Sequence, residues 1–281
     1  MKLNNGIISA QISERGAELK SVIKDGTEYM WCADEKYWAR TSPVLFPFVG
    51  SLKDKSYKLD GKVYPMSQHG FARDNEFTLT EHTETFAAYS FCETEETLKK
   101  YPFRFELVIK YTLSDNKIKI EWIVENKNDC VLSFSIGAHP AFNLKEGDNY
   151  FSFDTDKDIV CNLLDEAGLF DKTKVYTLKN DGYVKITDTM FDDDALIAEN
   201  RQAKEVCLCD KNKKPYIKVR FDTELFGLWS PAKKNAPFVC IEPWYGRCDS
   251  VDFCGELSER KHTINLEAHK KFSASYEIEF L

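Results

Sequence analysis

Apolar and polar residues alternate along much of the chain, and this alternation constrains the fold more than any other feature. In FRFELVIKY, residues 103–111, aromatic and aliphatic side chains occupy every second position. Residues 118–124 repeat the pattern after the turn signal SDNK, and residues 272–280 repeat it near the end of the sequence. A period of two places one set of side chains on one face of a β-strand. The first two segments therefore predict an antiparallel hairpin.

Turn signals recur at short intervals and indicate many short strands. Only residues 33–38 and 94–101 look helical, and both stretches are too short to cover a parallel sheet. The chain has 281 residues, 43% of them hydrophobic, which is enough for one large core. We predict an all-β fold, a large antiparallel β-sandwich that forms a single domain over residues 1–281. The turn signals are Asn5-Gly6, Asp25-Gly26, Asp60-Gly61 and Asp181-Gly182.

Charge and composition narrow the possible partners. The chain has 46 acidic and 38 basic residues, a net charge of -8, and no cluster of Lys and Arg that could follow a phosphate backbone. We therefore expect no nucleic-acid partner. The N-terminal stretch lacks the apolar run of a signal peptide, and no segment approaches the roughly 20 apolar residues that span a bilayer. We expect a soluble cytoplasmic protein without a membrane partner, either a monomer or a homodimer.

The nine cysteines occur singly, without any C-x-x-C spacing. Their odd number and their scatter indicate reduced thiols rather than a disulfide framework or a zinc cluster. Cys207 and Cys209 lie two apart in a predicted strand, so we expect both on one face, packed in the core.

Six segments break the alternation, and each mixes Gly, Pro or Asp with charged or aromatic residues. Loops and strand ends of this composition often carry binding groups on a rigid sheet. The segments are residues 39–54, 67–77, 136–143, 191–197, 226–231 and 236–250.

His139 lies between small residues and a proline, where a strand-like run ends. It could be a turn residue that hydrogen-bonds locally, or a proton donor at the mouth of a pocket. His69, in QHGFARD, has the same two interpretations because Gly70 allows a turn there. The three other histidines lie among polar residues, and we assign them to the surface: His82, His262 and His269.

Glu242 follows an apolar run and directly precedes Pro243. Partial burial against Trp244 and Tyr245 would raise the pKa of its carboxyl group and make it a better base near neutral pH. The alternative is a glutamate at a strand end that pairs with Arg247 or a lysine.

One imidazole and one carboxylate together form an acid/base pair. The sequence has no G-x-S-x-G elbow, no phosphate-binding glycine loop, and no H-x-H or H-E-x-x-H spacing for a metal. A proton-transfer reaction without metal or cofactor remains. Aromatic side chains in the irregular segments suit the apolar faces of a sugar, although many of the 20 phenylalanines must form the core. These aromatic residues are Phe71, Phe142, Trp229, Trp244 and Tyr245.

Five segments, in this order, carry a resemblance to a known family: SPVLFPFVG, QHGFARD, GAHPAFN, DDALI and APFVCIEPWYG. They extend from about residue 42 to residue 250, and the chain resembles the aldose 1-epimerase (galactose mutarotase-like) family, most closely its lactose-operon-associated branch. The resemblance implies a β-supersandwich that binds an aldose and interconverts its α and β anomers without metal or coenzyme.

The resemblance also implies residue roles. Glu242 would take the proton of the anomeric hydroxyl, and His139, facing it across the bound ring, would protonate the ring oxygen. His69 would hydrogen-bond the sugar. Asp194 would hold the substrate, although the adjacent Asp192 and Asp193 leave the register open.

Arg73, Arg40 and Trp229 are further candidates for binding the sugar. One departure from the family concerns the position after the glycine of VGSLKD, where an arginine is expected. This chain has Ser51 there, with Lys53 nearby, so another cation takes that role or the preferred sugar differs.

Three other functions compete with the mutarotase. A hexose-6-phosphate 1-epimerase would need cations that converge on a phosphate, drawn from Arg40, Lys53, Arg73 and Arg247. A carbohydrate-binding module would use the aromatic groove without catalysis. A glycosidase would need two opposed carboxylates, and it ranks last because only Glu242 is persuasive.

Overall fold

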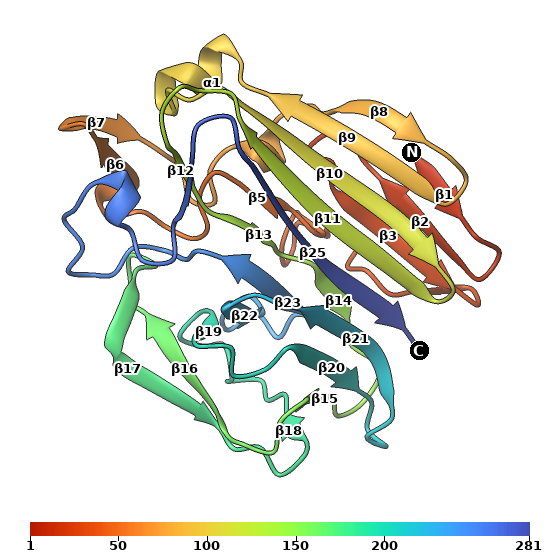
Figure 1. Cartoon of the computed structure of the whole chain (residues 1–281). Helices are drawn as coiled ribbons and strands as arrows, with labels where there is room; N and C mark the ends of the chain where they lie inside the picture. The colour runs from red at the N-terminus through yellow and green to blue at the C-terminus, as the bar shows by residue number, and fades with distance from the viewer.

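The computed structural model describes residues 1–281 and confirms the predicted all-β antiparallel architecture. Its largest sheet has nine strands and contains the longest strands of the chain (Figure 1). In spatial order they are β18 (Val184–Lys185), β15 (Tyr150–Phe153), β20 (Glu205–Cys209), β21 (Pro215–Phe221), β25 (Lys271–Phe280), β11 (Lys117–Asn126), β10 (Phe105–Ser114), β9 (Phe86–Cys92) and β8 (Thr78–His82).

A second large sheet of eight strands carries the interrupted segments around His139 and Glu242. Seven strands form a continuous order, and β14 pairs with β23 off this path. The strands are β17 (Phe170–Leu178), β16 (Ile159–Leu164), β19 (Leu196–Ala198), β22 (Leu225–Trp229), β23 (Phe238–Tyr245), β13 (Ile136–Ala138), β5 (Val44–Leu45) and β14 (Ala141–Asn143).

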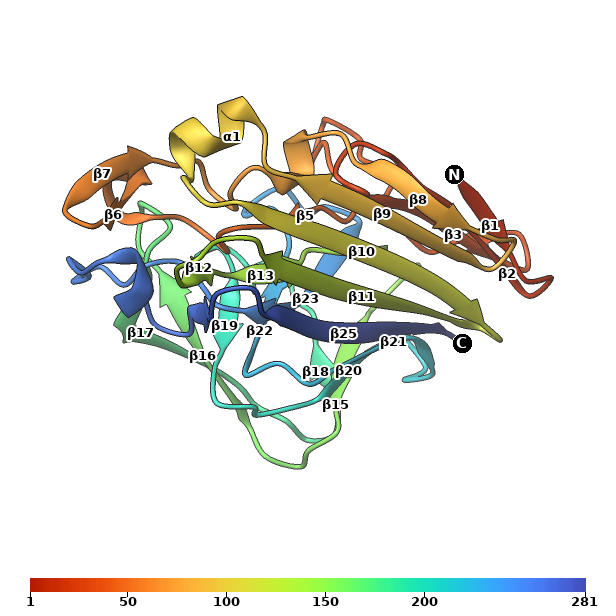
Figure 2. The ribbon, with the colours of Figure 1, turned by 45° about the horizontal axis from the view of Figure 1, so that its top comes forward.

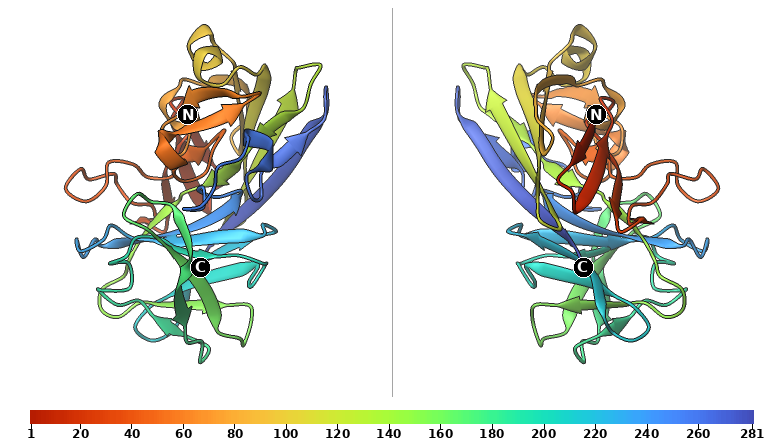
Figure 3. Two further views of the ribbon diagram at one scale, coloured as in Figure 1. Left: turned by 90° about the vertical axis from the view of Figure 1, so that its left-hand side faces the viewer. Right: turned by 90° about the vertical axis from the view of Figure 1, so that its right-hand side faces the viewer.

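Three smaller sheets complete the fold. The N-terminal strands lie at the opposite end of the molecule from β15 and β18 (Figure 3). The smaller sheets comprise β1 (Lys2–Asn4), β2 (Ile8–Ile12), β3 (Leu19–Lys24) and β4 (Thr27–Glu28), then the hairpin β6 (Ser56–Leu59) and β7 (Lys62–Pro65), and finally β12 (Leu132–Phe134) with β24 (Ile264–Leu266).

The predicted hairpin and the predicted strand at the end of the chain are both confirmed. β10 pairs with β11 along its whole length, and β25 pairs with the other edge of β11, so the three long strands run side by side (Figure 2). Leu107 and Ile109 of β10 face Val124 and Trp122 of β11, and all four are fully buried. Alternation alone was sufficient here because one face of each strand is buried against the rest of the core.

Helical structure is scarce. The stretch 94–101 contains the helix α1 (Glu95–Lys100), whose first turn is capped by Thr94 as the side chain accepts the backbone N–H of Thr97 at 3.2 Å. The prediction of a helix at residues 33–38 is wrong, because that segment forms only a turn around residues 35–37. Three short 3₁₀ turns also occur, η1 (Lys53–Lys55), η2 (Ala72–Asp74) and η3 (Leu257–Glu259).

The main core lies between the two large sheets. Tyr245 of β23 contacts the Trp122 ring of β11, and Phe226 of β22 contacts the Phe221 ring of β21. Cys207 and Cys209 are buried on β20, as predicted. All nine cysteines are free thiols in the structure. The aromatic contacts above place one face of β22 and β23 against the main core, so the opposite face of these strands can carry a site.

Candidate active site

Side chains along β23 point alternately to the main core and to a cavity on the opposite face. Val239, Ile241 and Tyr245 pack into or against the main core, whereas Glu242 and Trp244 line a cavity on the opposite face. Burial of Glu242 is confirmed, since only 1% of the residue is exposed. The prediction that Tyr245 helps to bury it is wrong, because Tyr245 lies on the other side of the strand.

His139 reaches this face because a strand is interrupted beside β23. β13 and β14 both pair with β23, and His139 and Pro140 form the break between them. Nε2 of His139 lies 3.3 Å from Oε2 of Glu242. The prediction that His139 stands at a strand end is confirmed, since β13 ends at Ala138. The two side chains that the resemblance pairs as acid and base are immediate neighbours, rather than standing a sugar ring's width apart.

Two glycines allow Trp244 to lie flat over the sheet. A Cβ atom on Gly137 of β13 would lie 2.6 Å from the indole, and a Cβ on Gly227 of β22 would lie equally close. Both glycines flank β23, with Gly137 paired to Trp244 and Gly227 paired to Glu242. Side chains at these positions would displace the indole, so the glycines allow Trp244 to take the position in which it lines the cavity.

His69 enters the cavity from a separate loop. Its φ is 65° and that of Gly70 is 70°, and a Cβ on Gly70 would clash at 2.3 Å with the carbonyl oxygen of Phe46. The backbone N–H of Gly50 donates to Nδ1 of His69 at 3.0 Å. Because Nδ1 accepts this hydrogen bond, the proton of the neutral imidazole is on Nε2.

The cavity has a volume of about 240 Å³. Pockets for drug-sized ligands typically measure about 300–1,000 Å³, so this space suits a single sugar ring. It brings together six of the seven predicted site residues, all except Arg40. The lining includes His69, Arg73, His139, Asp194, Trp229 and Glu242, together with Trp38, Gln68, Trp244 and Cys248.

Arg40 is the one predicted site residue that does not line the cavity. Arg40 instead pairs with Asp74 at 2.8 Å, outside the cavity lining. A larger cavity of about 390 Å³ lies elsewhere, between Leu144 and Phe238, but it contains no histidine, glutamate or arginine. The predicted acid/base pair lines the smaller cavity.

Burial acts in opposite directions on the pKa values of the central pair. Burial raises the pKa of Glu242 well above its usual range, and repulsion from the Asp194 carboxylate raises it further. The indole of Trp244 acts in the opposite direction and lowers this pKa. Burial lowers the pKa of His139 to about 3, and the positive charge of Arg73 contributes. Adding a second proton to the pair is therefore unfavourable, and removing its single proton is unfavourable too. The pair holds one proton over a wide pH interval around neutrality.

Aromatic rings surround the His139 imidazole. Trp38 stacks on it with ring centroids 4.7 Å apart, and Trp229 meets it edge-on at 5.2 Å. Asp194 accepts a hydrogen bond from the Trp229 indole N–H at 2.7 Å, which resolves the register of the three aspartates in favour of Asp194. Trp38 was missed from the sequence because it lies in the segment predicted as helix. Its only signal was a tryptophan among polar residues.

Two of the four candidate cations lie together, since Arg40 and Arg73 contact the Asp74 carboxylate at 2.8 Å and 3.8 Å, and the other two lie elsewhere. Arg73 lines the cavity, and its Nη2 donates to the carbonyl oxygen of Gln68 at 2.9 Å. Burial, with repulsion from Arg40, lowers the pKa of Arg73 to about 10, so it stays charged at neutral pH. Lys53 lines a different surface cavity, and Arg247 is buried in an ion pair with Glu199. No second cation lines the cavity in place of the arginine expected at position 51, where this chain has Ser51.

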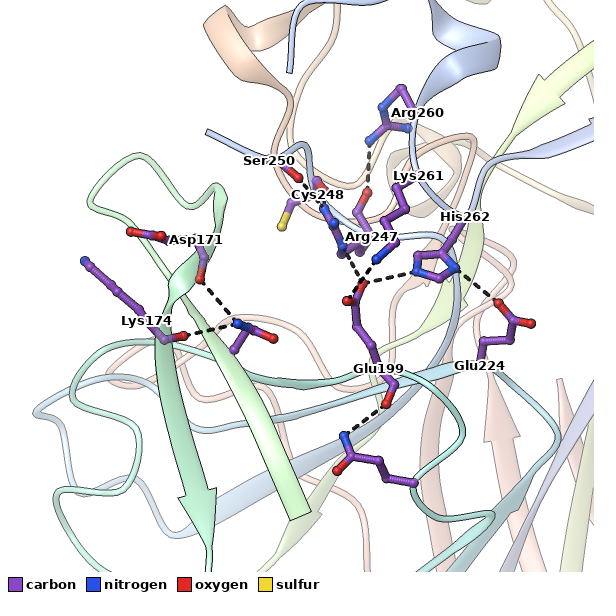
Figure 4. A network of polar contacts seen from close by, with 12 residues as sticks. Asp171, Lys174, Glu199, Glu224, Arg247, Cys248, Ser250, Arg260, Lys261 and His262 are labelled. Atoms are coloured by element: carbon purple, nitrogen blue, oxygen red, sulfur yellow. Dashed lines mark hydrogen bonds and ion pairs between the residues drawn. The ribbon is translucent and has the colours of Figure 1, made fainter. Parts of the chain in front are cut away.

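A buried polar network lies behind the cavity wall (Figure 4). The carboxylate of Glu199 binds Nε of Arg247 at 2.8 Å, Nε2 of His262 at 3.1 Å and Nζ of Lys261 at 3.3 Å. Burial alone would raise the pKa of Glu199, but hydrogen bonds from His262 and Arg247 lower it to about 2. The assignment of His262 to the surface is wrong, since its side chain is only 15% exposed, whereas His82 and His269 are exposed as predicted.

The network reaches the cavity through residues 247–249. Asp249 accepts hydrogen bonds from Nε of Arg260 at 2.6 Å and from the backbone N–H of Lys53 at 3.0 Å. Cys248, between the two ion pairs, packs so closely on Gly50 that a Cβ on that glycine would lie 2.6 Å away. Since Gly50 also bonds His69, the ion pairs support the backbone that orients this imidazole.

Comparison with known proteins follows this geometry. A family model described as aldose 1-epimerase matches residues 1–279. The chain belongs to the aldose 1-epimerase family. It is 31% identical to the chromosomal Protein LacX of Lactococcus lactis subsp. lactis, over 100% of this chain and 99% of that protein. The resemblance to the lactose-operon-associated branch is thereby confirmed.

Solved structures agree with this membership. A galactose mutarotase related enzyme from Lactobacillus acidophilus superposes with a TM-score of 0.95 at 34% identity, covering 100% of this chain and 97% of that chain. A galactose mutarotase-like protein from Lactobacillus casei gives 0.94 at 27% identity, with 100% and 99% covered. This aldose 1-epimerase family member is thus an enzyme of the sugar epimerase or mutarotase type, with a sugar as its substrate. None of its helices has the length and apolar character needed to cross a bilayer.

Proposed function

We propose that the protein interconverts the α and β anomers of an unphosphorylated hexose, with Glu242 as the general base and His139 as the general acid. The observation that carries the proposal is the 3.3 Å separation of Nε2 of His139 and Oε2 of Glu242 at one cavity. Both oxygens that exchange protons in this reaction are bonded to the anomeric carbon. Acid and base must therefore be neighbours, as these two groups are.

The reaction moves one proton on and one proton off the pair. Glu242 takes the proton of the anomeric hydroxyl, the bond between the anomeric carbon and the ring oxygen breaks, and His139 protonates that oxygen. Rotation about the bond between carbon-1 and carbon-2 presents the other face of the aldehyde, and the reverse transfers close the ring. The pair carries one proton before and after ring opening, on His139 in the first state and on Glu242 in the second. The pKa shifts place the single proton of the resting pair on Glu242, so it passes to His139 across the 3.3 Å contact before Glu242 accepts the anomeric proton.

The other cavity residues have binding roles in this proposal. Nε2–H of His69 donates to the sugar, because Nδ1 is occupied by the Gly50 N–H. Asp194 accepts from a sugar hydroxyl while it holds Trp229 in place, and Arg73 donates to the hydroxyl edge. The rings of Trp38 and Trp229 provide apolar surface for the sugar face.

Mutarotation of freshly dissolved α-glucose and α-galactose, followed by polarimetry, tests the proposal. Glu242→Gln and His139→Asn should each lose most of the rate above the spontaneous reaction, since a positioned acid or base typically contributes about 10²–10⁴-fold. His82→Asn is the matched control, because His82 is exposed and far from the cavity lining. Near-normal rates in either site variant would refute the assignment of roles.

The charge of the cavity favours a neutral sugar over a hexose 6-phosphate. Arg73 is the only Arg or Lys side chain among the lining residues. Arg40 pairs with Asp74, Arg247 pairs with Glu199, and Lys53 lines a different cavity. Phosphate recognition typically uses several charge-assisted hydrogen bonds. Rates on glucose and on glucose 6-phosphate, compared side by side, separate these substrates. A non-catalytic binding module would bind sugar equally well after Glu242→Gln and would never accelerate mutarotation.

A further inference from the structure

The acid/base pair has a third chemically active neighbour. Cys240 precedes Glu242 by two residues on β23, so its side chain points to the same face. Its Sγ, a ring nitrogen of His139 and a carboxylate oxygen of Glu242 all lie within 4.8 Å of one another. The three residues are 0%, 7% and 1% exposed, in that order. Sulfur, imidazole nitrogen and carboxylate oxygen are together the donor set of a zinc site.

We propose that Cys240, His139 and Glu242 bind a thiophilic divalent cation of the Zn²⁺ type, and that the bound ion inhibits the enzyme by occupying its acid/base pair. No mutarotase step requires this ion. Binding of the ion at this site would instead switch the proposed activity off when the protein is exposed to the metal. Binding of the ion does not depend on the proposed function, whereas inhibition rests on it.

The distances are close to those of a tetrahedral site. With Zn–N and Zn–O of about 2.0–2.2 Å and Zn–S of about 2.3 Å, ligand atoms around zinc lie about 3.3–3.6 Å apart. The 3.3 Å between His139 and Glu242 already fits. Cys240 Sγ needs to approach by about 1.2 Å at most, because its limit is 4.8 Å.

The polar atoms of the pair have unused bonding capacity. No hydrogen bond of regular geometry reaches either carboxylate oxygen of Glu242, although the residue is 1% exposed and Nε2 of His139 lies 3.3 Å from Oε2. Buried acceptors are normally paired, so an unpaired buried carboxylate is a favourable ligand for a cation. The cavity supplies the open fourth position of a site with three protein ligands, where water completes the coordination.

Charge balance favours the exchange. One Zn²⁺ replaces two protons, one from the Cys240 thiol and one from the His139–Glu242 pair, so the net charge of the buried site does not change. A metal ion deprotonates a coordinating thiol outright. The thiolate also sets the selectivity, since sulfur favours Zn²⁺ and Cd²⁺ over Mg²⁺ and Ca²⁺.

The test measures metal binding directly with the full chain. Zn²⁺ affinity is obtained by competition with a chromophoric chelator, and Cd²⁺ is added to record thiolate-to-metal charge-transfer absorption. We expect one ion per chain, with the absorption lost in Cys240→Ser and the Zn²⁺ affinity lowered by more than about tenfold. Cys248→Ser is the matched control, because Cys248 is a second buried thiol at the same cavity but lies outside the cluster. Equal affinity in the wild type and Cys240→Ser would overturn the proposal.

A second variant and a second readout keep the test decisive. Glu242→Gln removes a ligand from the same strand face and should also weaken Zn²⁺ binding, so misfolding of one variant leaves the other. Zn²⁺ should inhibit mutarotation competitively with the sugar, reversibly on addition of EDTA, and Mg²⁺ should have no effect. Inhibition is measured in the wild type, Cys240→Ser and Cys248→Ser, each relative to its own zinc-free rate, and Glu242→Gln serves for metal binding alone. Tight Zn²⁺ binding without any mutarotase activity would support the site and refute the proposed function, whereas activity insensitive to bound Zn²⁺ would refute inhibition.

Discussion

The backbone N–H of Gly50 donates to Nδ1 of His69 at 3.0 Å, and this bond decides which imidazole nitrogen can serve a ligand. Burial lowers the pKa of His69 well below its usual value, and the charge of Arg73 adds to the shift, so the imidazole is neutral at neutral pH. Its Nε2–H is then a fixed donor. The orientation of a buried histidine by a backbone partner is a common feature of sites that need one defined tautomer.

Two replacements of His69 separate the acceptor role of Nδ1 from the donor role of Nε2. His69→Asn keeps an acceptor near the Nδ1 position but removes the Nε2 donor, so it should raise KM for the sugar while preserving thermal stability. His69→Gln keeps a donor near Nε2 and loses the acceptor for Gly50, so it should lower stability by about 1–3 kcal/mol, the cost of an unpaired buried donor. Steady-state kinetics and urea unfolding of both variants check this prediction. Equal effects of the two variants on KM would contradict it.

The pH dependence of the rate follows from the His139–Glu242 pair. The pKa of His139 is lowered to about 3 and that of Glu242 is raised, so the active form with one proton gains a second proton only in acid and loses its proton only at elevated pH. We expect a broad plateau of kcat/KM around neutrality, measured by anomer-resolved NMR. An acid limb with its midpoint near 6.5, the ordinary histidine value, would show that the imidazole is not held neutral.

Glu199 should dominate the acid sensitivity of the fold. Its pKa in the folded state is about 2, below the ordinary value of 4.5, so its contribution to stability is present above pH 4.5 and is lost as the pH falls toward 2. The full shift corresponds to at most about 3 kcal/mol. Urea unfolding across this pH range should show a flatter pH dependence in Glu199→Gln than in the wild type. Glu224→Gln, which changes the exposed partner of His262, should retain the wild-type slope.

Gly227 should tolerate no side chain while Trp244 is present. In Gly227→Ala the new Cβ would lie 2.6 Å from the indole, and overpacking of this kind typically costs about 1–3 kcal/mol. The displaced indole should also reduce turnover. Trp244→Phe removes the ring atoms that clash, so the double variant should be less destabilised than the sum of the two single variants. Additive free energies of unfolding would argue against this contact.

Sequence periodicity predicted faces more reliably than partners. Alternation placed Leu107 and Ile109 in the core, and it placed Glu242 in a buried strand. It could not show that β13 and β14 pair with β23, which lies about 100 residues further along the chain. A period of two indicates which face of a strand is buried, but it does not indicate which strand is the hydrogen-bonding partner. The family resemblance, rather than periodicity, predicts that His139 and Glu242 share one site.

Electrostatic partners were the least predictable part of the site. Arg247 was a candidate partner for Glu242 or for a phosphate, yet it lies beyond the end of β23 and pairs with Glu199. His262 has polar neighbours in sequence but is largely buried by tertiary contacts. A side chain's polarity is readable from sequence, whereas the direction in which a loop carries it depends on contacts between distant segments.

The break between β13 and β14 limits how this part of the sequence can vary. Both segments are fixed to β23 by hydrogen bonds, so the two residues between them have no freedom to take up an added or deleted residue. An insertion or deletion there would shift one flank by a single position and exchange its inward and outward side chains. Length, more than residue identity, is therefore the property that evolution and protein engineering must preserve between residues 138 and 141.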